Sequence, residues 1–361
     1  MCPQGPVFEW TIVATSNPSE TLQARFADQP FLLAPMAGVT DAAYRIMCRR
    51  HGARTAYSEM VSVAGLAYAS EKTWDLVLPA SDEPDVCVQL FGSKPEQFAS
   101  AVEAVERRVG EKLVLIDINM ACPARKVISK GEGSALMEQP DRAEAIVRAC
   151  VERAHVPVTV KMRKDFKSGR LLAPEFAARM EQAGAAAVAV HGRSAGQLYT
   201  GSADWSVIDA VADRVSVPVI GSGDVFTAED ACRMLEQTAA TAVFVARGTY
   251  GNPWVFEDAR ALALEGRAVE PRGSRQKLAA LREHLLLLHE RDAHMARART
   301  FATWYLKGMP HAAGWRGRVV GCSEFEDFMA LVDEIEADVA RCEELTRRGA
   351  SVPGFHGDRV G

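Results

Sequence analysis

The sequence lacks the features that mark membrane, secreted and metal-cluster proteins. It has no run of about 18 apolar residues free of charge, so we expect no membrane-spanning helix. Met1–Asp28 has no basic start followed by an apolar core, so we expect no signal peptide and predict a cytoplasmic location. The eight cysteines form no C-x-x-C pair, which disfavours zinc sites, iron–sulfur clusters and a disulfide framework. We therefore expect reduced cysteines and no bound metal.

Repeats, low-complexity segments and a strong charge imbalance are also absent. The formal net charge of −5 gives no global sign of nucleic-acid binding, although a local basic segment is compatible with it. At 361 residues, 48% of them hydrophobic, the chain exceeds one ordinary domain of about 100–200 residues. This length suits an α/β barrel of about 250 residues with a small appended domain.

Eight short apolar runs alternate with amphipathic stretches through most of the chain. Each run is followed by a helix-like segment, such as Pro95–Arg107 or Ala228–Gln237, as buried parallel strands require. This pattern predicts a TIM (β/α)8 barrel and disfavours a doubly wound open sheet, because eight regular units fit within about 230 residues. The predicted strands are Phe31–Ala34, Thr55–Ser58, Val86–Leu90, Leu113–Ile118, Val156–Val160, Ala186–Val190, Val217–Ile220 and Thr241–Ala246.

The chain divides into three predicted parts. Residues 1–30, with apolar Phe8, Trp10, Ile12 and Val13, are expected to form an arm or a cover for the barrel bottom. Residues 31–266 form the barrel, and residues 267–361 a small helical domain. In the last part, Gln276–Arg291 places leucines on one face at helical spacing.

Polar residues stand at nearly every strand end, where barrel enzymes assemble their sites. Cys122 follows an apolar run together with Asn119, whereas a structural cysteine would more often lie inside the run. An inert loop cysteine is the alternative. The polar residues at the ends of the other predicted strands are Glu59, Gln89, Lys161 and Arg163, His191 and Arg193, Ser222–Asp224, and Arg247. Glu59 is expected either to pair with Lys161 across the barrel mouth or to form a plain structural ion pair.

Two small-residue turns, Gly221–Asp224 and Ala246–Thr249, follow the last two predicted strands. Barrels of this kind bind phosphate there, although ordinary βα connections would look alike. Gln89 offers a donor and an acceptor to an amide-like ring edge, and Lys161 can place a cation beside a ring that gains negative charge on reduction. Flavin mononucleotide (FMN) meets both demands.

Six motifs, in their order and spacing, resemble those of the tRNA-dihydrouridine synthases. They are Ala34–Asp41 (APMAGVTD), Gln89–Gly92 (QLFG), Asn119–Pro123 (NMACP), Lys161–Arg163 (KMR), His191–Arg193 (HGR) and Gly221–Asp224 (GSGD). The resemblance runs from about Phe31 to Trp304–Gly308 and is closest to the bacterial B-type branch. It implies reduction of uridine to 5,6-dihydrouridine in tRNA, with FMN as cofactor and NADPH or NADH as reductant.

The resemblance also implies roles for single residues. Cys122 would give a proton to C5 of uracil after flavin hydride reaches C6, while Asn119 and Arg193 would hold the base. A free thiol is mostly protonated at neutral pH, which suits an acid, although Arg125 and Lys126 nearby would favour a thiolate. The implied cofactor contacts are Pro35, Met36 and Ala37 along the flavin, Gln89 and Lys161 at its polar edge, His191, and Ser222, Gly223, Asp224, Ala246 and Arg247 at its phosphate.

Three positions depart from the family pattern. Members commonly carry Asn at position 222 and Gly at positions 121 and 246. Ser222 keeps a hydroxyl but loses an amide. Ala121 and Ala246 would be strained if either backbone needed a positive φ.

A local basic segment could grip the RNA, from which a uridine must be extruded at a cost of a few kcal/mol. Residues 267–318 hold eleven Lys and Arg against four Asp and Glu, interleaved with aromatics, as suits phosphate and base contacts. We predict tRNA contacts by Arg297, Arg299, Lys307 and Arg316 there, and by Arg125 and Lys126 at the barrel mouth. The alternative is a helical bundle with Trp304 and Tyr305 in its core.

Two other functions compete with a tRNA-modifying enzyme. A flavin-dependent dehydrogenase or reductase of a free pyrimidine, resembling dihydroorotate dehydrogenase, would share the barrel and the flavin site, but the basic segment speaks against it. A non-catalytic RNA-binding module would lack the acid, and Cys122 is present. The leading prediction is a monomeric cytoplasmic enzyme that binds FMN and tRNA.

Overall fold

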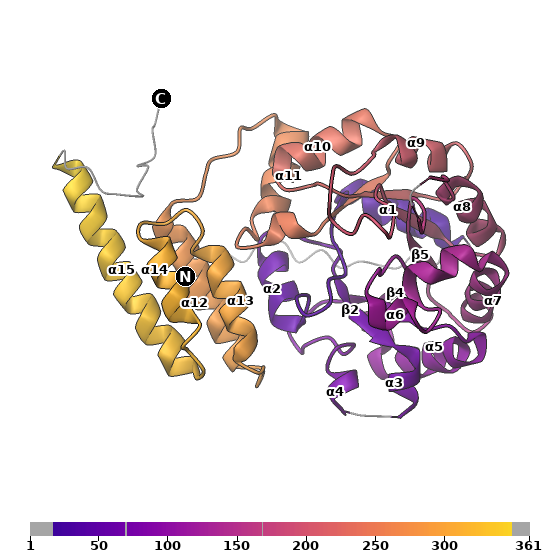
Figure 1. Ribbon diagram of the computed structural model, residues 1–361, viewed down its shortest axis with the longest axis horizontal. Coiled ribbons are helices and arrows are strands. Elements are labelled where there is room, and N and C mark those ends of the chain that lie inside the picture. Colours follow the sequence, from indigo (N-terminus) through magenta and orange to yellow (C-terminus); the bar gives the residue numbers. More distant parts are fainter. Residues whose placement is uncertain (1–16, 69–70, 168, 349–361) are drawn as a thin grey trace.

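The computed structural model describes residues 17–68, 71–167 and 169–348, and its larger part is a barrel of eight parallel strands (Figure 1). The hydrogen-bonded order is β1-β8-β7-β6-β5-β4-β3-β2. Leu33 then closes the ring, because its N–H donates to the Thr55 carbonyl and it forms a bridge with Ala56. The predicted TIM-barrel fold is confirmed, and the open-sheet alternative is wrong. The strands are β1 (Phe31–Leu33), β2 (Tyr57–Ser62), β3 (Val86–Phe91), β4 (Leu113–Met120), β5 (Val158–Arg163), β6 (Ala187–His191), β7 (Val219–Ser222) and β8 (Ala242–Val245).

Several strands extend further toward the mouth than the apolar runs predict. Asn119 of β4 pairs in register with Lys161 of β5, and Arg163 pairs with His191 of β6. These polar residues continue the ladder because an inward side chain at the mouth meets a cavity and not an apolar core. The site residues therefore lie on rigid strands, where the sequence had suggested strand-following loops.

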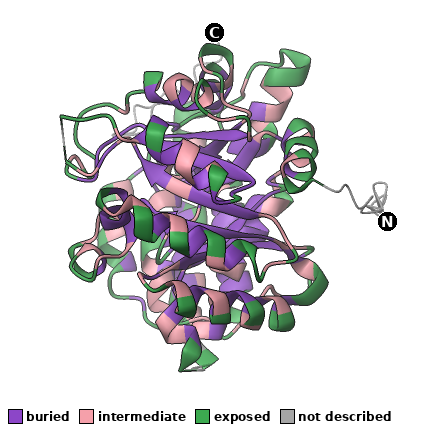
Figure 2. Ribbon diagram, turned by 90° about the vertical axis from the view of Figure 1, so that its right-hand side faces the viewer, coloured by how far each residue is buried: buried purple, intermediate pink, exposed green. Residues whose placement is uncertain are grey.

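Helices cover the outside of the barrel, so that the buried strands lie inside a ring with an exposed outer face (Figure 2). In α5, Phe98, Val102, Val105 and Val109 recur at helical spacing and are buried, while Pro95 occupies the first turn. The outer helices are α2 (Ala42–Arg50), α3 (Val63–Ala67), α4 (Glu71–Trp74), α5 (Pro95–Val109), α7 (Pro140–Val151), α8 (Ala173–Gln182), α9 (Ser206–Ala212), α10 (Ala228–Gln237) and α11 (Val255–Glu265).

Helix α1 (Pro18–Asp28) lies across the bottom of the barrel. Its Leu22 and Phe26 are buried against inward-facing strand residues such as Leu32. Arg25 donates to the Thr55 hydroxyl at 2.9 Å and to Asp85 at 2.6 Å, both at the amino-terminal ends of strands. The apolar positions between Phe8 and Val13 lie outside the described residues.

Four helices form a separate unit beside α2, drawn in orange and yellow in Figure 1. They are α12 (Ser274–His289), α13 (Ala296–Tyr305), α14 (Ala312–Val319) and α15 (Phe325–Arg347). The leucines of α12 are buried with Phe301 of α13 and Phe328 of α15. Tyr305 is buried with them, as the bundle alternative requires, whereas Trp304 is half-buried.

The helices in the described part of the chain are not of the kind that crosses a bilayer. None of them combines the length and the apolar character that a membrane crossing needs.

Candidate active site at the barrel mouth

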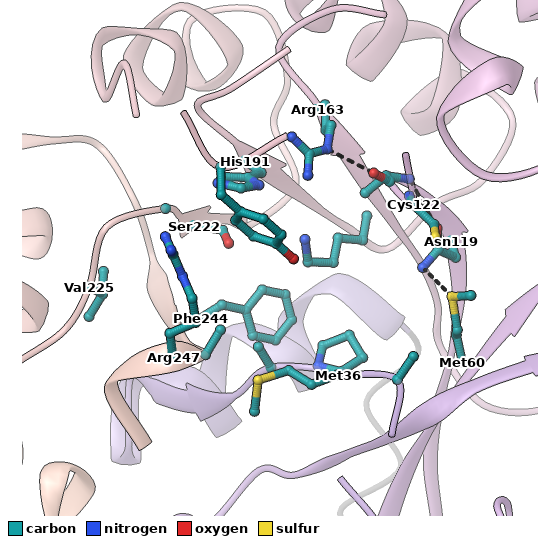
Figure 3. Close-up of a pocket in the computed structure, with 18 of the residues that line it drawn as sticks. Met36, Met60, Asn119, Cys122, Arg163, His191, Ser222, Val225, Phe244 and Arg247 are labelled. Atoms are coloured by element: carbon teal, nitrogen blue, oxygen red, sulfur yellow. Dashed lines mark hydrogen bonds between the residues drawn. The ribbon is translucent and has the colours of Figure 1, made fainter. Parts of the chain in front are cut away.

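A cavity of about 250 Å³ opens at the carboxyl ends of the strands. Cys122 and Asn119 lie on one side of it, and His191, Ser222 and Arg247 on the other (Figure 3). All the residues that the sequence suggested as flavin contacts line this cavity. Asn119 and Cys122, which were suggested to act on the base, line it too. The lining residues are Ala34, Pro35, Met36, Ala37, Met60, Gln89, Asn119, Ala121, Cys122, Pro123, Lys161, Arg163, His191, Tyr199, Ser222, Gly223, Asp224, Val225, Phe226, Phe244, Ala246, Arg247 and Tyr250.

The backbone around Cys122 is held by three separate elements. Asn119 Oδ1 accepts the N–H groups of Ala121 at 3.1 Å and Cys122 at 2.9 Å. Arg163 Nε donates to the Ala121 carbonyl at 2.8 Å, and the Ser134 hydroxyl donates to the Cys122 carbonyl at 3.0 Å. Among the seven described cysteines, Cys122 alone is not buried. A fixed, accessible thiol in a cavity is suited to chemistry with a bound molecule.

A buried carboxylate determines how the amides beside the cavity point. Asp117 accepts from Gln89 Nε2 at 2.6 Å and from the Thr159 hydroxyl at 2.6 Å. An ionised carboxylate only accepts, so Gln89 must turn its oxygen toward Asn119, whose Nδ2 donates to it at 2.8 Å. Asn119 must in turn direct Oδ1 at the Cys122 backbone. One charge below the cavity thus orients both amides and, through them, the Cys122 segment.

Asp117 and Lys161 are buried opposite charges, and each favours the charged form of the other against the effect of burial. Burial raises the pKa of Asp117 to about 6, against the effect of the hydrogen bonds from Gln89 and Thr159 and the charge of Lys161. Burial also lowers the pKa of Lys161 to about 8, helped by the positive charge of Arg163 and opposed by Asp117. Lys161 therefore stays mostly protonated at neutral pH. Its Nζ lies 5.8 Å from the centre of the Phe244 ring, so a cation stands beside an aromatic residue of the cavity wall.

The raised pKa of Asp117 predicts a pH-dependent gain in stability for Asp117→Asn. The folded state binds this proton more tightly than the unfolded chain, for which the ordinary value is near 3.8. The contribution of Asp117 to stability is therefore fully present below pH 3.8 and is lost as the pH rises through 6. Asn keeps an acceptor for Gln89, so the variant should be up to about 3 kcal/mol more stable than the parent at pH 8 and should lose that advantage by pH 4.

Denaturant unfolding of flavin-free protein at the two pH values measures this difference. Asp204→Asn, which alters an exposed carboxylate, is the control for removing one negative charge. An advantage of equal size at pH 4 and pH 8 would show that the charge of Asp117 is not its cause.

The Glu59–Lys161 ion pair that the sequence suggested is not formed. Glu59 instead pairs with Arg297 of α13 at 2.7 Å and accepts the N–H of Gly38. The reason is direction: Glu59 reaches toward the helical unit and the loop after β1, whereas Lys161 projects into the barrel beside Asp117. The other expectation for Glu59, an ion pair of structural kind, matches what the structure contains.

Two arginines share one carboxylate at the opposite end of the cavity, which leaves a net positive charge there. Arg193 forms a two-bond pair with Asp224, 2.7 Å to each carboxylate oxygen, and Arg247 approaches the same carboxylate at 3.3 Å. Although burial raises the pKa of Asp224, the hydrogen bonds from Arg193 and the Ala203 N–H lower it overall. The Arg247 guanidinium lies between two aromatic rings, 4.7 Å from the centre of Tyr199 and 4.8 Å from that of Phe226. The Asp224 side chain therefore orients arginines and is not itself an anion ligand.

Arg193 does not reach the cavity wall, where the sequence placed it as a contact to the base. Its side chain is 3% exposed and is also bonded to the Thr200 and Gly201 carbonyls. Arg163 lines the cavity instead, with Nε and Nη1 used on carbonyl groups. Sequence reasoning placed Arg163 at a strand end without giving it a role.

His191 is a neutral imidazole in this environment. Burial lowers its pKa well below the usual value, and the positive charges of Lys161, Arg163, Arg193 and Arg247 lower it further. Gly223 lets the chain pass close to the ring, because a Cβ there would lie 2.7 Å from His191 Cδ2. The neutral ring can accept one hydrogen bond and donate another.

Ala121 and Ala246, for which the resemblance implied glycine, cause no backbone strain. Among the described residues, the non-glycine positions with positive φ are Leu198, Asp224, Asp292 and His311. Ala246 has a φ of −111°, and Ala121 is not among those four either. Their methyl groups simply form part of the cavity wall.

Most of the basic excess in residues 267–318 is neutralised by carboxylates. Arg275 pairs with Glu343 at 2.7 Å, and Arg282 pairs with Asp333 at 2.5 Å, so α12 and α15 are joined by charge. Arg297 is paired, and Arg299 donates to the Cys322 carbonyl at 2.7 Å. Lys307 is exposed and Arg316 half-buried. The others that meet carboxylates are Arg267, Arg272, Arg291 and Arg318.

The basic residues on the loop after β4 are exposed. Arg125 and Lys126 begin the short helix α6 (Arg125–Ile128), and Lys130 follows it. They follow Cys122 in the same loop, beyond Pro123, which is the last residue of that loop to line the cavity.

Sequence reasoning missed several residues of the site. Asp117 gave a usable signal, because a charged residue inside an apolar strand is rarely buried without a purpose. Tyr199, Phe244 and Tyr250 gave none, since exposed or strand aromatics are common.

Comparison with known proteins identifies close relatives over most of the chain. The dihydrouridine synthase (Dus) family model matches residues 32–340. The chain is 37% identical over 291 residues to tRNA-dihydrouridine synthase B of Pseudomonas aeruginosa, covering 80% of this chain and 86% of that protein. It is 34% identical over 331 residues to the B enzyme of Pseudomonas syringae pv. tomato, covering 91% and 94%.

Among solved structures, a histamine dehydrogenase from Rhizobium sp. 4-9 matches with a TM-score of 0.49 and 13% identity. The match covers 72% of this chain and 49% of that one, about half of its length.

Proposed function

This chain belongs to the dihydrouridine synthase family, and from that premise we propose that it reduces uridine in tRNA to 5,6-dihydrouridine with FMN as cofactor and NADPH or NADH as reductant. The observation that carries the proposal is the fixed, accessible Cys122 thiol in a cavity whose other end is cationic. A tRNA substrate agrees with the cytoplasmic location expected from the sequence.

The donor set of the cavity fits a flat, anionic cofactor. Met36 and Phe244 offer apolar surface, and small residues such as Ala34 and Ala37 leave room beside them. Lys161 supplies a cation for a ring that becomes negative, and Arg247 supplies one for a phosphate. When bound, FMN would supply the hydride that reaches C6 of uracil.

Cys122 is the proposed acid, giving its proton to C5 of the base. The hydrogen bonds from Asn119, Arg163 and Ser134 fix the segment that carries the thiol, so the proton is presented from a defined side of the cavity.

Asn119 and Arg163 are the proposed contacts to the base. Asn119 Nδ2 has one strong acceptor, Gln89, and one weak acceptor, the Met60 sulfur at 3.6 Å (Figure 3). A uracil carbonyl would replace that sulfur at little cost. We assign to Arg163 the contact that the sequence suggested for Arg193, because Arg163 lines the cavity and Arg193 is committed to Asp224.

Product analysis distinguishes this proposal from the two alternatives. A tRNA enzyme forms dihydrouridine within tRNA, a free-pyrimidine dehydrogenase acts on the base alone, and a non-catalytic module forms neither. Nucleoside mass spectrometry of tRNA from a deletion strain, mapped by position, should show uridine where the parent strain has dihydrouridine.

The cofactor proposal has its own measurement. The purified protein should be yellow, should release FMN on denaturation and should oxidise NADPH. Release of FAD, or absence of flavin after reconstitution, would contradict the assignment of this cavity.

A further inference from the structure

Helix α13 of the helical unit presents two residues to the barrel from one face. Arg297 and Trp304 are seven positions apart, which is two helical turns. Arg297 Nη1 donates to Asp41 at 2.8 Å, and Nη2 donates to Glu59 at 2.7 Å. The Trp304 ring stacks on Tyr250 with the ring centres 3.7 Å apart and the planes 2° from parallel.

Both contacts of α13 connect to residues in or next to the cavity lining. Glu59 accepts the N–H of Gly38 with its other oxygen, and Gly38 directly follows the lining residues Pro35, Met36 and Ala37. Tyr250 itself lines the cavity after β8. The helical unit therefore supports two walls, one through a carboxylate and one through an aromatic stack.

Arg297 neutralises two carboxylates, Asp41 and Glu59, that lie on either side of its guanidinium. Glu59 is 5% exposed and the side chain of Asp41 15%, so each has lost most of its water. The Arg297 guanidinium is the cation between them; without it, two poorly hydrated negative charges would face each other. Asp41 also accepts from the Tyr44 N–H at 2.9 Å and so begins α2.

The backbone beside the Tyr250–Trp304 stack is also closely packed. Gly251, next to Tyr250, has a φ of +65°, and a Cβ there would lie 2.5 Å from the Trp304 carbonyl carbon and oxygen. The chain after β8 thus approaches α13 so closely that a side chain has no room at position 251.

We propose that α13 completes the cofactor pocket, with Arg297 and Trp304 as positioning residues for the loop after β1 and for Tyr250. The inference rests on the proposed FMN function and deepens it. Docking of the helical unit and binding of FMN then stabilise each other, because such coupling between two sites is reciprocal. Arg297, which the sequence suggested as an RNA contact, acts on the cofactor side instead.

The test measures FMN affinity without RNA, from the rise in flavin fluorescence as the holoenzyme is diluted. Arg297→Gln should weaken FMN binding roughly tenfold, within the range usual for coupled sites, and Trp304→Leu should also weaken it. Arg318→Gln removes one arginine from the same helical unit, where it pairs with Glu334, and should keep the parent affinity.

A second substitution separates positioning from a general loss of structure. Glu59→Gln keeps an acceptor for the Gly38 N–H and removes the uncompensated charge, so Glu59→Gln/Arg297→Gln should recover part of the FMN affinity. Parent affinity in both Arg297→Gln and Trp304→Leu would overturn the inference, and so would no recovery in the double variant. A parent protein that binds no FMN would instead overturn the proposed function.

Discussion

Replacing Cys122 by Ala should slow reoxidation of the reduced enzyme by tRNA about 10²–10⁴-fold, the usual contribution of a positioned acid. Reduction by NADPH should stay near the parent rate, because in the proposed reaction only the step with uracil uses a proton from Cys122. The backbone contacts of Cys122 do not involve its sulfur, so the loop should keep its place in the variant.

Single-turnover experiments followed by flavin absorbance measure the two steps separately. Cys122→Ser replaces the thiol by a hydroxyl of much weaker acidity and should resemble the Ala variant more than the parent. Unchanged reoxidation by tRNA in Cys122→Ala would falsify the acid role. Loss of both steps would indicate a collapsed site.

Replacing Arg125, Lys126 and Lys130 together by Gln should weaken tRNA binding and flatten its dependence on salt. Each phosphate contact contributes about −0.7 to −0.9 to the slope of log affinity against log salt. The slope of the variant should therefore be less negative than that of the parent by about two to three. These side chains are exposed on the loop that carries Cys122, and the backbone flanking an extruded uridine would pass near that loop if the uridine reaches Cys122 as proposed.

The matched control removes three arginines that already meet carboxylates. Arg275→Gln/Arg282→Gln/Arg318→Gln changes the net charge equally, but those residues pair with α15. It should alter the salt slope less than the loop variant does. If instead Lys307→Gln/Arg316→Gln flattens the slope and the loop variant does not, the RNA grip lies on the helical unit, as the sequence suggested.

The sequence predicted the barrel and most of the cavity because both follow from local pattern. Apolar runs at regular spacing determine the strands, and the topology then brings their ends to one mouth. Gln89, Asn119 and Lys161 could be assigned for that reason.

The pairing of charges could not be predicted in the same way. Arg193 and Arg297 look like free cations in the sequence, and their partners, Asp224 and Glu59, lie 31 and 238 positions away. Which acid reaches which base depends on how helices and loops pack in three dimensions. The local count of basic residues therefore overstated the positive surface of the helical unit.

The distribution of thiols gives the protein a built-in reporter group. Six of the seven described cysteines are buried, and burial raises the pKa of Cys87 to about 12 and that of Cys232 to about 11. Among these seven cysteines, a mild alkylating reagent at neutral pH should react almost exclusively with Cys122. A fluorophore or a trifluoromethyl group attached there would sense the polarity of the cavity directly. Within the described part of the chain, a label can thus be placed at the proposed acid without an engineered cysteine.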